Sequence, residues 1–274
     1  MTNSIIWMKR ITGYLGCALC LMCSPIAQAQ DSELAQKLSN PIANLISVPF
    51  QFNYNDKIGP LQNGKQSYVN VQPVVPISLN ADWNMISRTI LPIVDQNEVV
   101  PGAGHQFGLG DTLQSLFFSP KAPGPGGTIW GVGPAMQFPT ATDSKLGSGK
   151  YAAGPTGVVL WQTGGWTYGM LANHLWTYAG DSNRNYTSST FLQPFVSYTT
   201  KDAWTFTLNT ESTYNWVTDK WSVPINATVA KLLRFGDQPV QIGGGPRYWL
   251  ASPDNAGPKN FGARFFVTFL FPKK

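Results

Sequence analysis

The chain has 274 residues and a formal net charge of +5, with 43% hydrophobic and only 12% charged residues. The charged fraction is about half of that in ordinary soluble domains, and beyond the N-terminus no apolar run approaches the ~20 residues of a membrane-spanning helix. This composition excludes a polytopic helical membrane protein, and the many aromatic and aliphatic residues exclude disorder. Lys and Arg are scattered singly, which does not suggest a nucleic-acid partner.

The N-terminus has the features of a secretory signal peptide. Lys9 and Arg10 precede an apolar stretch over residues 11–22, and residues 27–29 supply the small-x-small pattern that signal peptidase reads. We therefore expect residues 1–29 to be removed on export, which lowers the formal net charge to +3.

The cysteines all lie within this predicted signal peptide, at Cys17, Cys20 and Cys23. The mature chain therefore offers no disulfide and no thiol ligand. A retained anchor is an alternative, but the apolar stretch is too short for a stable span. A lipoprotein signal acylated at Cys17 is another, although Tyr14 and Leu15 fit that pattern poorly.

The next segment, residues 30–45, carries apolar residues at near-helical spacing, interrupted by Pro41: Leu34, Leu38, Ile42 and Leu45. This spacing is typical of a short helix, which proline would end. We expect either such a helix at the periplasmic mouth, tucked into the lumen of a barrel, or a linker.

From Ile46 onward the chain runs in segments that alternate apolar with small or polar residues, which is the pattern of β-strands. In the last segment Phe265, Val267, Phe269 and Phe271 share one face, opposite Arg264, Phe266, Thr268 and Leu270. We predict twelve strands, over residues 46–55, 67–79, 82–94, 107–119, 128–139, 151–162, 165–179, 187–200, 203–217, 220–234, 239–251 and 261–272.

The predicted connections alternate in length. Long links over residues 56–66, 95–106, 140–150 and 252–260 alternate with tight turns such as 80–81 and 201–202, although 120–127 and 218–219 break the rule. Short turns at one rim and long loops at the other are typical of outer-membrane barrels. The sequence thus predicts an all-β fold, an antiparallel transmembrane β-barrel over residues 46–274 in the bacterial outer membrane.

Aromatic side chains cluster at the ends of the predicted strands. One group adjoins the short turns: Phe50, Trp83, Phe117, Phe118, Trp130, Trp161, Trp166, Trp204 and Phe271. The other adjoins the long loops: Tyr68, Phe107, Tyr151, Trp176, Tyr178, Trp216, Trp221 and Tyr248. Amphipathic rings favour the headgroup level of a bilayer, so these groups indicate two girdles, whereas a soluble β-sandwich would place aromatics at mid-strand.

Prolines inside the predicted strands argue against a closed barrel, because such a barrel has no edge at which a missing N–H donor is harmless. They are Pro73, Pro92, Pro134, Pro155, Pro194, Pro224 and Pro246. We expect each to lie at a bulge or to face inward onto water.

Five segments together resemble the bacterial outer-membrane transporter family named for the MetA pathway of phenol degradation, whose members are sometimes mislabelled neuromedin U. They are residues 38–51, 107–112 (FGLGDT), 139–143 (PTATD), 190–195 (TFLQPF) and 208–212 (LNTES). The resemblance implies a β-barrel with a transport role, brings no catalytic residues, and its name points to apolar or aromatic solutes. The ending at residues 271–274, FPKK, departs from the terminal aromatic usual for recognition by the outer-membrane assembly machinery.

Every second residue from Thr205 to Thr213 is polar. If this polar face points inward, it predicts a set of polar residues that line the lumen. An arginine on the lipid face at the bilayer midplane would cost ~2–4 kcal/mol, so the lumen is the favoured place for charge. The pore-lining candidates are Arg88, Asp111, Asn209, Glu211, Arg247 and Arg264. The interpretation as a constriction that sorts solutes by charge and the interpretation as a salt bridge network that fills space both stay open, and Asp111 has a structural alternative next to a turn.

Enzymatic chemistry finds little support in the sequence. Only His105, in a Gly-rich loop, and His174, among aromatic residues, could serve as bases, and no serine occupies a recognisable nucleophile motif. Isolated histidines and the lack of cysteine in the mature chain predict no metal site and no cofactor. We expect a passive channel for small solutes; the alternative is a closed structural or surface-binding barrel that meets a partner through loops 95–106 and 140–150.

Overall fold

The structure, a computed structural model, describes residues 25–272. Residues 1–24, which hold most of the predicted signal peptide, lie outside the described residues. In the described part of the chain a single α-helix, α1, spans Pro25–Leu38, and a short 3-10 turn spans Pro125–Gly127. Within residues 25–272, no helix is both long and apolar enough to cross a lipid bilayer.

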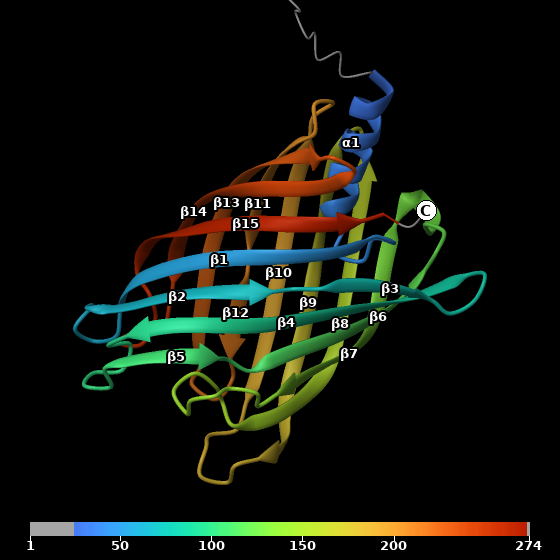
Figure 1. Cartoon of the computed structure of the whole chain (residues 1–274). Helices are drawn as coiled ribbons and strands as arrows, with labels where there is room; N and C mark the ends of the chain where they lie inside the picture. The colour runs from blue at the N-terminus through green and yellow to red at the C-terminus, as the bar shows by residue number, and fades with distance from the viewer. Residues whose placement is uncertain (1–24, 273–274) are drawn as a thin grey trace, which may run out of the picture.

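Fifteen strand segments follow α1 and make up one antiparallel sheet (Figure 1). They are β1 (Ile46–Ile58), β2 (Gly64–Val71), β3 (Val74–Ser78), β4 (Trp83–Asn97), β5 (His105–Leu109), β6 (Thr112–Pro120), β7 (Ile129–Phe138), β8 (Lys150–Thr163), β9 (Trp166–Gly180), β10 (Ser188–Thr199), β11 (Trp204–Thr210), β12 (Ser212–Asn215), β13 (Lys220–Phe235), β14 (Gln238–Ala251) and β15 (Asn260–Phe271).

The sheet closes into a barrel because β1 pairs with β15 as well as with β2. Three of the barrel strands are interrupted once each, between β2 and β3, between β5 and β6, and at Glu211 between β11 and β12. Counting each interrupted strand as one gives twelve barrel strands, which confirms the predicted number. Over residues 25–272 the chain is nearly all antiparallel β, with a short helix at the N-terminal end of this range.

The predicted alternation of faces is present in the last strand. Phe265 and Phe269 are exposed on the outer surface, whereas Arg264 and Thr268 are buried inside. The register places Arg264 opposite Asn53 of β1, so polar side chains of neighbouring strands meet on the inner face. The outer surface is therefore apolar, and the inner surface at these strands is polar, as in transmembrane barrels.

The strands extend beyond the predicted ends at the long-loop rim. β1 runs to Ile58 and β4 to Asn97, which reduces the connections there to residues 59–63 and 98–104. Short turns at residues 164–165 and 236–237 lie at the opposite rim, where α1 also lies (Figure 1). We call these the long-loop rim and the short-turn rim.

Most of the predicted girdle aromatics are exposed on the outer surface, including Trp83, Trp166, Phe107 and Trp216. Two are not. Phe117 is fully buried, with no exposed surface, in an apolar cluster inside the barrel, and Tyr68 faces inward, where its hydroxyl contacts Arg247. The prediction that these two residues belong to the outer girdles is wrong. Their position near a strand end was used for the prediction, and this position does not show whether an aromatic ring faces outward or inward.

The prolines divide into two groups. Pro73 lies in the β2–β3 interruption, Pro92 lies opposite the β5–β6 interruption, and Pro224 lies at a register shift between β13 and β14. The expectation of a bulge or an inward face is wrong for the other four, which are exposed on the outer surface: Pro134, Pro155, Pro194 and Pro246.

Three of these outer prolines follow glycine, at residues 133–134, 154–155 and 245–246, which we call the Gly–Pro sites. At each, the ladder with one neighbouring strand lacks consecutive pairs. A Cβ on the glycine would clash with a backbone carbonyl oxygen of that neighbour, Leu116, His174 or Ala227. Glycine thus lets the adjacent strand approach closely where proline has no N–H to donate.

Helix α1 and the following linker fill the short-turn rim. Asp31 pairs with Arg234 at 2.6 Å, and the Ser32 hydroxyl donates to the Thr200 carbonyl at 3.0 Å. Leu34 packs in an apolar cluster with inner residues such as Leu232. The helix ends at Leu38, shortly before Pro41, and the residue that precedes a proline disfavours helical backbone. The predicted short helix is therefore confirmed, and residues 39–45 form a linker between it and β1.

Candidate functional site

An ion cluster occupies the lumen where β11 gives way to β12. Glu211 accepts two hydrogen bonds from Arg264, from Nη1 at 2.8 Å and from Nη2 at 2.7 Å. Arg247 Nη2 donates to the same carboxylate at 3.2 Å. The arginine side chains are 4% and 3% exposed and the glutamate 19%, so the cluster is shielded from bulk water.

The local sequence explains why the β11–β12 strand is interrupted at Glu211. The barrel neighbours on both sides carry prolines close to this level, Pro194 of β10 and Pro224 of β13. Proline cannot donate to the ladder. The side chains nevertheless keep their inward alternation, because the register on either side of the interruption is unchanged: Thr210 pairs with Ile225 and Thr213 with Ser222.

Neutral polar side chains of β1 and β2 hold the arginines in place. Asn53 Oδ1 accepts from Arg264 Nε at 2.9 Å and from Arg247 Nη1 at 3.2 Å. The Tyr68 hydroxyl accepts from Arg247 Nη1 at 2.7 Å, and the Arg247 guanidinium lies 4.9 Å from the Trp249 ring centroid. Sequence reasoning missed Asn53 and Tyr68, although the polar alternation of residues 51, 53 and 55 was a usable signal.

Arg88 and Asn209 also face the lumen. Arg88 Nη2 donates to Gln72 Oε1 at 3.0 Å, and Gln72 in turn donates to Gln51 at 3.2 Å. Among residues 25–272, no carboxylate lies within ion-pair distance of Arg88. Asn209 accepts from Asn226 at 2.8 Å.

Five of the six pore-lining candidates are therefore brought to the inner wall, with Glu211, Arg247 and Arg264 in direct contact. Asp111 lies apart from them, at the long-loop rim. Its Oδ2 accepts from the Ser148 amide at 2.7 Å, from the Ser148 hydroxyl at 2.6 Å and from Gln137 at 3.2 Å.

The loop that Asp111 holds, residues 139–149, folds back against the β5–β6 interruption. Thr142 Oγ1 accepts from the Leu109 amide at 3.0 Å, and Thr140 accepts from the Thr112 amide at 2.9 Å. Gly110 is in close contact with this loop. Asp111 thus has a role in positioning the loop, which is the structural alternative considered from the sequence.

The other half of the inner wall is apolar. Buried residues from β4, β6, β8 and β9 form one cluster with the linker residue Ile42: Ile86, Phe117, Val158, Leu160 and Leu171. Phe191 and Phe195 of β10 pack against it. The lumen therefore presents an ionic wall around β14, β15 and β1 and an apolar wall around β6–β9.

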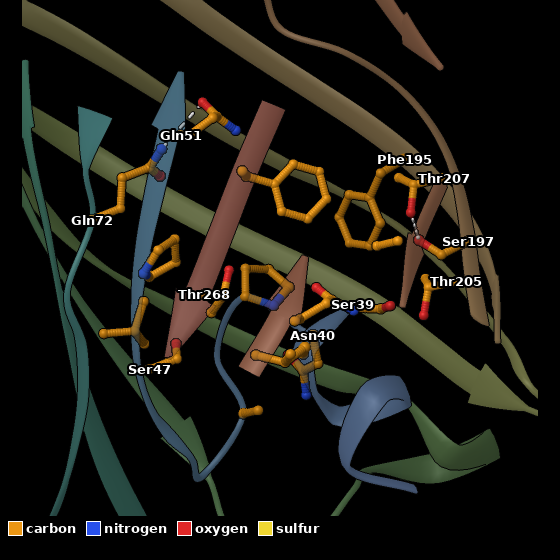
Figure 2. Close-up of a pocket in the computed structure, with 18 of the residues that line it drawn as sticks. Ser39, Asn40, Ser47, Gln51, Gln72, Phe195, Ser197, Thr205, Thr207 and Thr268 are labelled. Atoms are coloured by element: carbon orange, nitrogen blue, oxygen red, sulfur yellow. Dashed lines mark hydrogen bonds between the residues drawn. The ribbon is translucent and has the colours of Figure 1, made fainter. Parts of the chain in front are cut away.

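A cavity of about 240 Å³ lies inside the barrel, between the ion cluster and the linker after α1. Figure 2 shows Ser39 and Asn40 of the linker at one end of it and Gln51 and Gln72 toward the other, with Phe195 pointing in from β10. Arg88, Asn209 and Arg264 also line the cavity. The space is thus bordered by candidate residues together with the N-terminal segment.

The two histidines lie elsewhere. His105 contacts Asp95 at 3.2 Å at the exposed long-loop rim, and His174 shares a hydrogen bond of 2.7 Å with Thr190 on the outer face. Within residues 25–272, no serine hydroxyl is hydrogen-bonded to either ring. The same residues contain no group of three or more His, Cys, Asp or Glu side chains placed to hold a metal ion.

The fold is similar to that of a solved outer-membrane channel. An outer membrane channel from Pseudomonas putida F1 superposes with a TM-score of 0.64 at 15% identity, covering 83% of this chain and 94% of that one. An outer membrane phospholipase from Salmonella typhi gives 0.47 at 9% identity, covering 82% of this chain and 90% of that one. No family model matches the chain, and no curated protein matches it.

The fold, the apolar exterior and the polar, partly charged lumen define the class of protein: a transmembrane β-barrel of the bacterial outer-membrane type with twelve strands. The channel from Pseudomonas putida F1 is similar in fold. The phospholipase likeness is too weak to bear on activity.

Proposed function

We propose that the protein is an outer-membrane channel through which small solutes pass passively along the lumen. The observation that carries the proposal is the cavity of about 240 Å³ inside the barrel, bounded by the ion cluster. Barrels of eight strands fill with side chains, whereas those of sixteen to eighteen leave a wide aqueous channel, so twelve strands favour a narrow route. Apolar or aromatic solutes, which the family resemblance implies, belong to this proposal.

The pore-lining roles of the candidates are part of the same proposal. Arg88, Asn209, Glu211, Arg247 and Arg264 line or border the route. Asp111 acts indirectly by fixing the loop at the long-loop rim. Since the linker after α1 partly fills the other rim, only small solutes fit unless that segment moves.

Reconstitution tests the channel directly. The purified protein is inserted into liposomes, and swelling in small sugars is measured together with conductance in planar bilayers. A small conductance is expected for the wild type. Ile42→Asp, which places a charge in the apolar cluster, should displace the linker and raise the conductance, whereas Leu61→Asp, at an exposed loop position, should not. No conductance and no swelling in either the wild type or the Ile42 variant would contradict the proposal.

A closed structural or surface-binding barrel is the second candidate. It is favoured by the segments that occupy both rims, the linker with Ile42 and the loop over residues 139–149. Shortening the loops over residues 98–104 and 139–149 separates the two functions. A channel still conducts after this change, whereas a surface-binding barrel loses its partner.

Processing and biogenesis complete the proposal. Residues 1–29 act as a signal peptide, residues 30–45 as a periplasmic segment, and residues 46–274 as the barrel, which the outer-membrane assembly machinery inserts into lipid. No enzymatic activity, cofactor or metal is part of the proposed function. N-terminal sequencing of the membrane-extracted protein should begin at Gln30.

A further inference from the structure

The charges that line the luminal cavity all have one sign. Lys37, Arg88 and Arg264 contribute to its wall, and no Asp or Glu side chain does so among the described lining residues. Lys37 is paired with Glu33 at 2.7 Å and Arg264 with Glu211. Only Arg88 lines the cavity as a cation whose described contact is a neutral amide, that of Gln72.

An arginine has five N–H donors and carries its charge at any ordinary pH. Arg88 uses one donor for Gln72 Oε1 at 3.0 Å. Arg88 is half-buried and shares the counter-charge that acts on it, Glu211, with Arg247 and Arg264. This charge is therefore incompletely balanced inside the barrel, and a carboxylate beside it would form short, charge-assisted hydrogen bonds. The cavity therefore favours an anion over a neutral or cationic solute.

The remaining wall of the cavity has a different chemistry. Phe195 of β10 and Phe266 of β15 line it together with Val74 and Pro41, and Figure 2 shows the Phe195 ring directed into the space. Phenyl rings favour offset or edge-to-face contact with another ring. A bare inorganic anion would leave these surfaces uncovered, whereas a flat apolar body would contact them.

The size of the cavity suits a ligand with a single aromatic ring. An apolar cavity of about 150 Å³ accommodates benzene, so about 240 Å³ has room for one ring with a carboxylate. We propose that this cavity is a binding site for a small aromatic monocarboxylate, with the carboxylate on Arg88 and the ring between Phe195 and Phe266. The inference deepens the proposed channel function by naming a solute class.

Calorimetric titration of the detergent-solubilised full protein tests the site, with sodium benzoate as the probe and benzamide as its neutral counterpart. Benzoate should bind at least tenfold more tightly than benzamide, because hydrogen bonds to a charged partner are the stronger ones. Arg88→Gln should weaken benzoate binding at least tenfold and leave benzamide unchanged. The matched control Lys201→Gln removes the same charge from an exposed turn at the short-turn rim and should have no effect.

Several results would overturn the inference: no benzoate binding at millimolar concentration, equal binding of benzamide, or unchanged benzoate affinity in Arg88→Gln. Should Arg88→Gln fail to fold, Arg88→Lys, which keeps the charge, takes its place. Arg88→Lys and the wild type should both bind benzoate more tightly than benzamide, and equal binding of the two probes would overturn the inference. Binding is measured in detergent and passage in liposomes, so the two proposals fail separately. Benzoate binding without passage of any solute refutes the channel alone, whereas passage without benzoate binding refutes only this site.

Discussion

Replacing Glu211 by Gln removes the carboxylate that Arg247 and Arg264 share while keeping the shape of the side chain. Three hydrogen bonds to charged groups are affected, each worth about 1.5–3 kcal/mol. The amide oxygen of Gln can still accept, which lowers the loss. Removing one partner of a buried ion pair costs about 3–5 kcal/mol, and we predict a decrease of that size in the free energy of unfolding.

Urea unfolding of the protein in lipid vesicles, followed by tryptophan fluorescence, measures this decrease. Glu33→Gln is the matched control, because Glu33 pairs with Lys37 at 2.7 Å on the surface of α1, with side chains 67% and 53% exposed. Such a pair contributes at most about 1 kcal/mol. If Glu211→Gln cost no more than Glu33→Gln, the ion cluster would not stabilise the barrel.

A double-mutant cycle separates the pair from the rest of the cluster. Arg264→Gln alone should also destabilise, but the double variant Glu211→Gln/Arg264→Gln should lose less than the sum of the two single changes. Coupling energies of about 0.5–3 kcal/mol are typical of residues in one network. Strict additivity would contradict the contact geometry of 2.7–2.8 Å between the two side chains.

Two further predictions concern the wall and a loop. Gly154→Ala should lower the free energy of unfolding by about 1–3 kcal/mol, because the new Cβ would clash with the His174 carbonyl. Gly157→Ala is the control and should be near neutral, since a Cβ there would make only ordinary contacts. Equal effects of the two changes would refute the close-approach argument. Asp111→Asn should release the loop over residues 139–149 and speed tryptic cleavage there, while Asp237→Asn in a turn at the other rim should not; unchanged cleavage rates would show that Asp111 does not hold the loop.

Side-chain alternation was sufficient to predict the number of strands and most of their faces. The period of two along residues 261–272 separates Phe265 and Phe269 from Arg264, and the structure has the same separation. The same logic placed Glu211, Arg247 and Arg264 on the inner face. Alternation is local, so it survives without any knowledge of which strands are neighbours.

The contacts within the lumen could not be predicted in this way. Which inward residues lie at the same level depends on the register between strands, and Arg247 meets Tyr68 across a separation of 179 residues. The face of Asp111 was undetermined because a register change between β4 and the β5–β6 strand falls beside it. Phe117 was misplaced for a different reason. The strand around it alternates regularly, but this alternation was not used to tell a ring that faces the apolar interior from a ring in an outer girdle.

The Gly–Pro sites were visible in the sequence as Gly-Pro dipeptides inside three predicted strands, but only the prolines were considered. Proline alone suggests a bulge, whereas glycine before it indicates that a neighbouring backbone comes close. At Gly245 that neighbour is the Ala227 carbonyl, which no composition or periodicity argument identifies.

These same sites make the wall of the cylinder unevenly stiff around its circumference. Consecutive ladder pairs are missing between β6 and β7, between β8 and β9, and between β13 and β14. Bending of the cross-section should concentrate along these three seams, and the amides beside them should be the first in the wall to exchange their hydrogens with solvent.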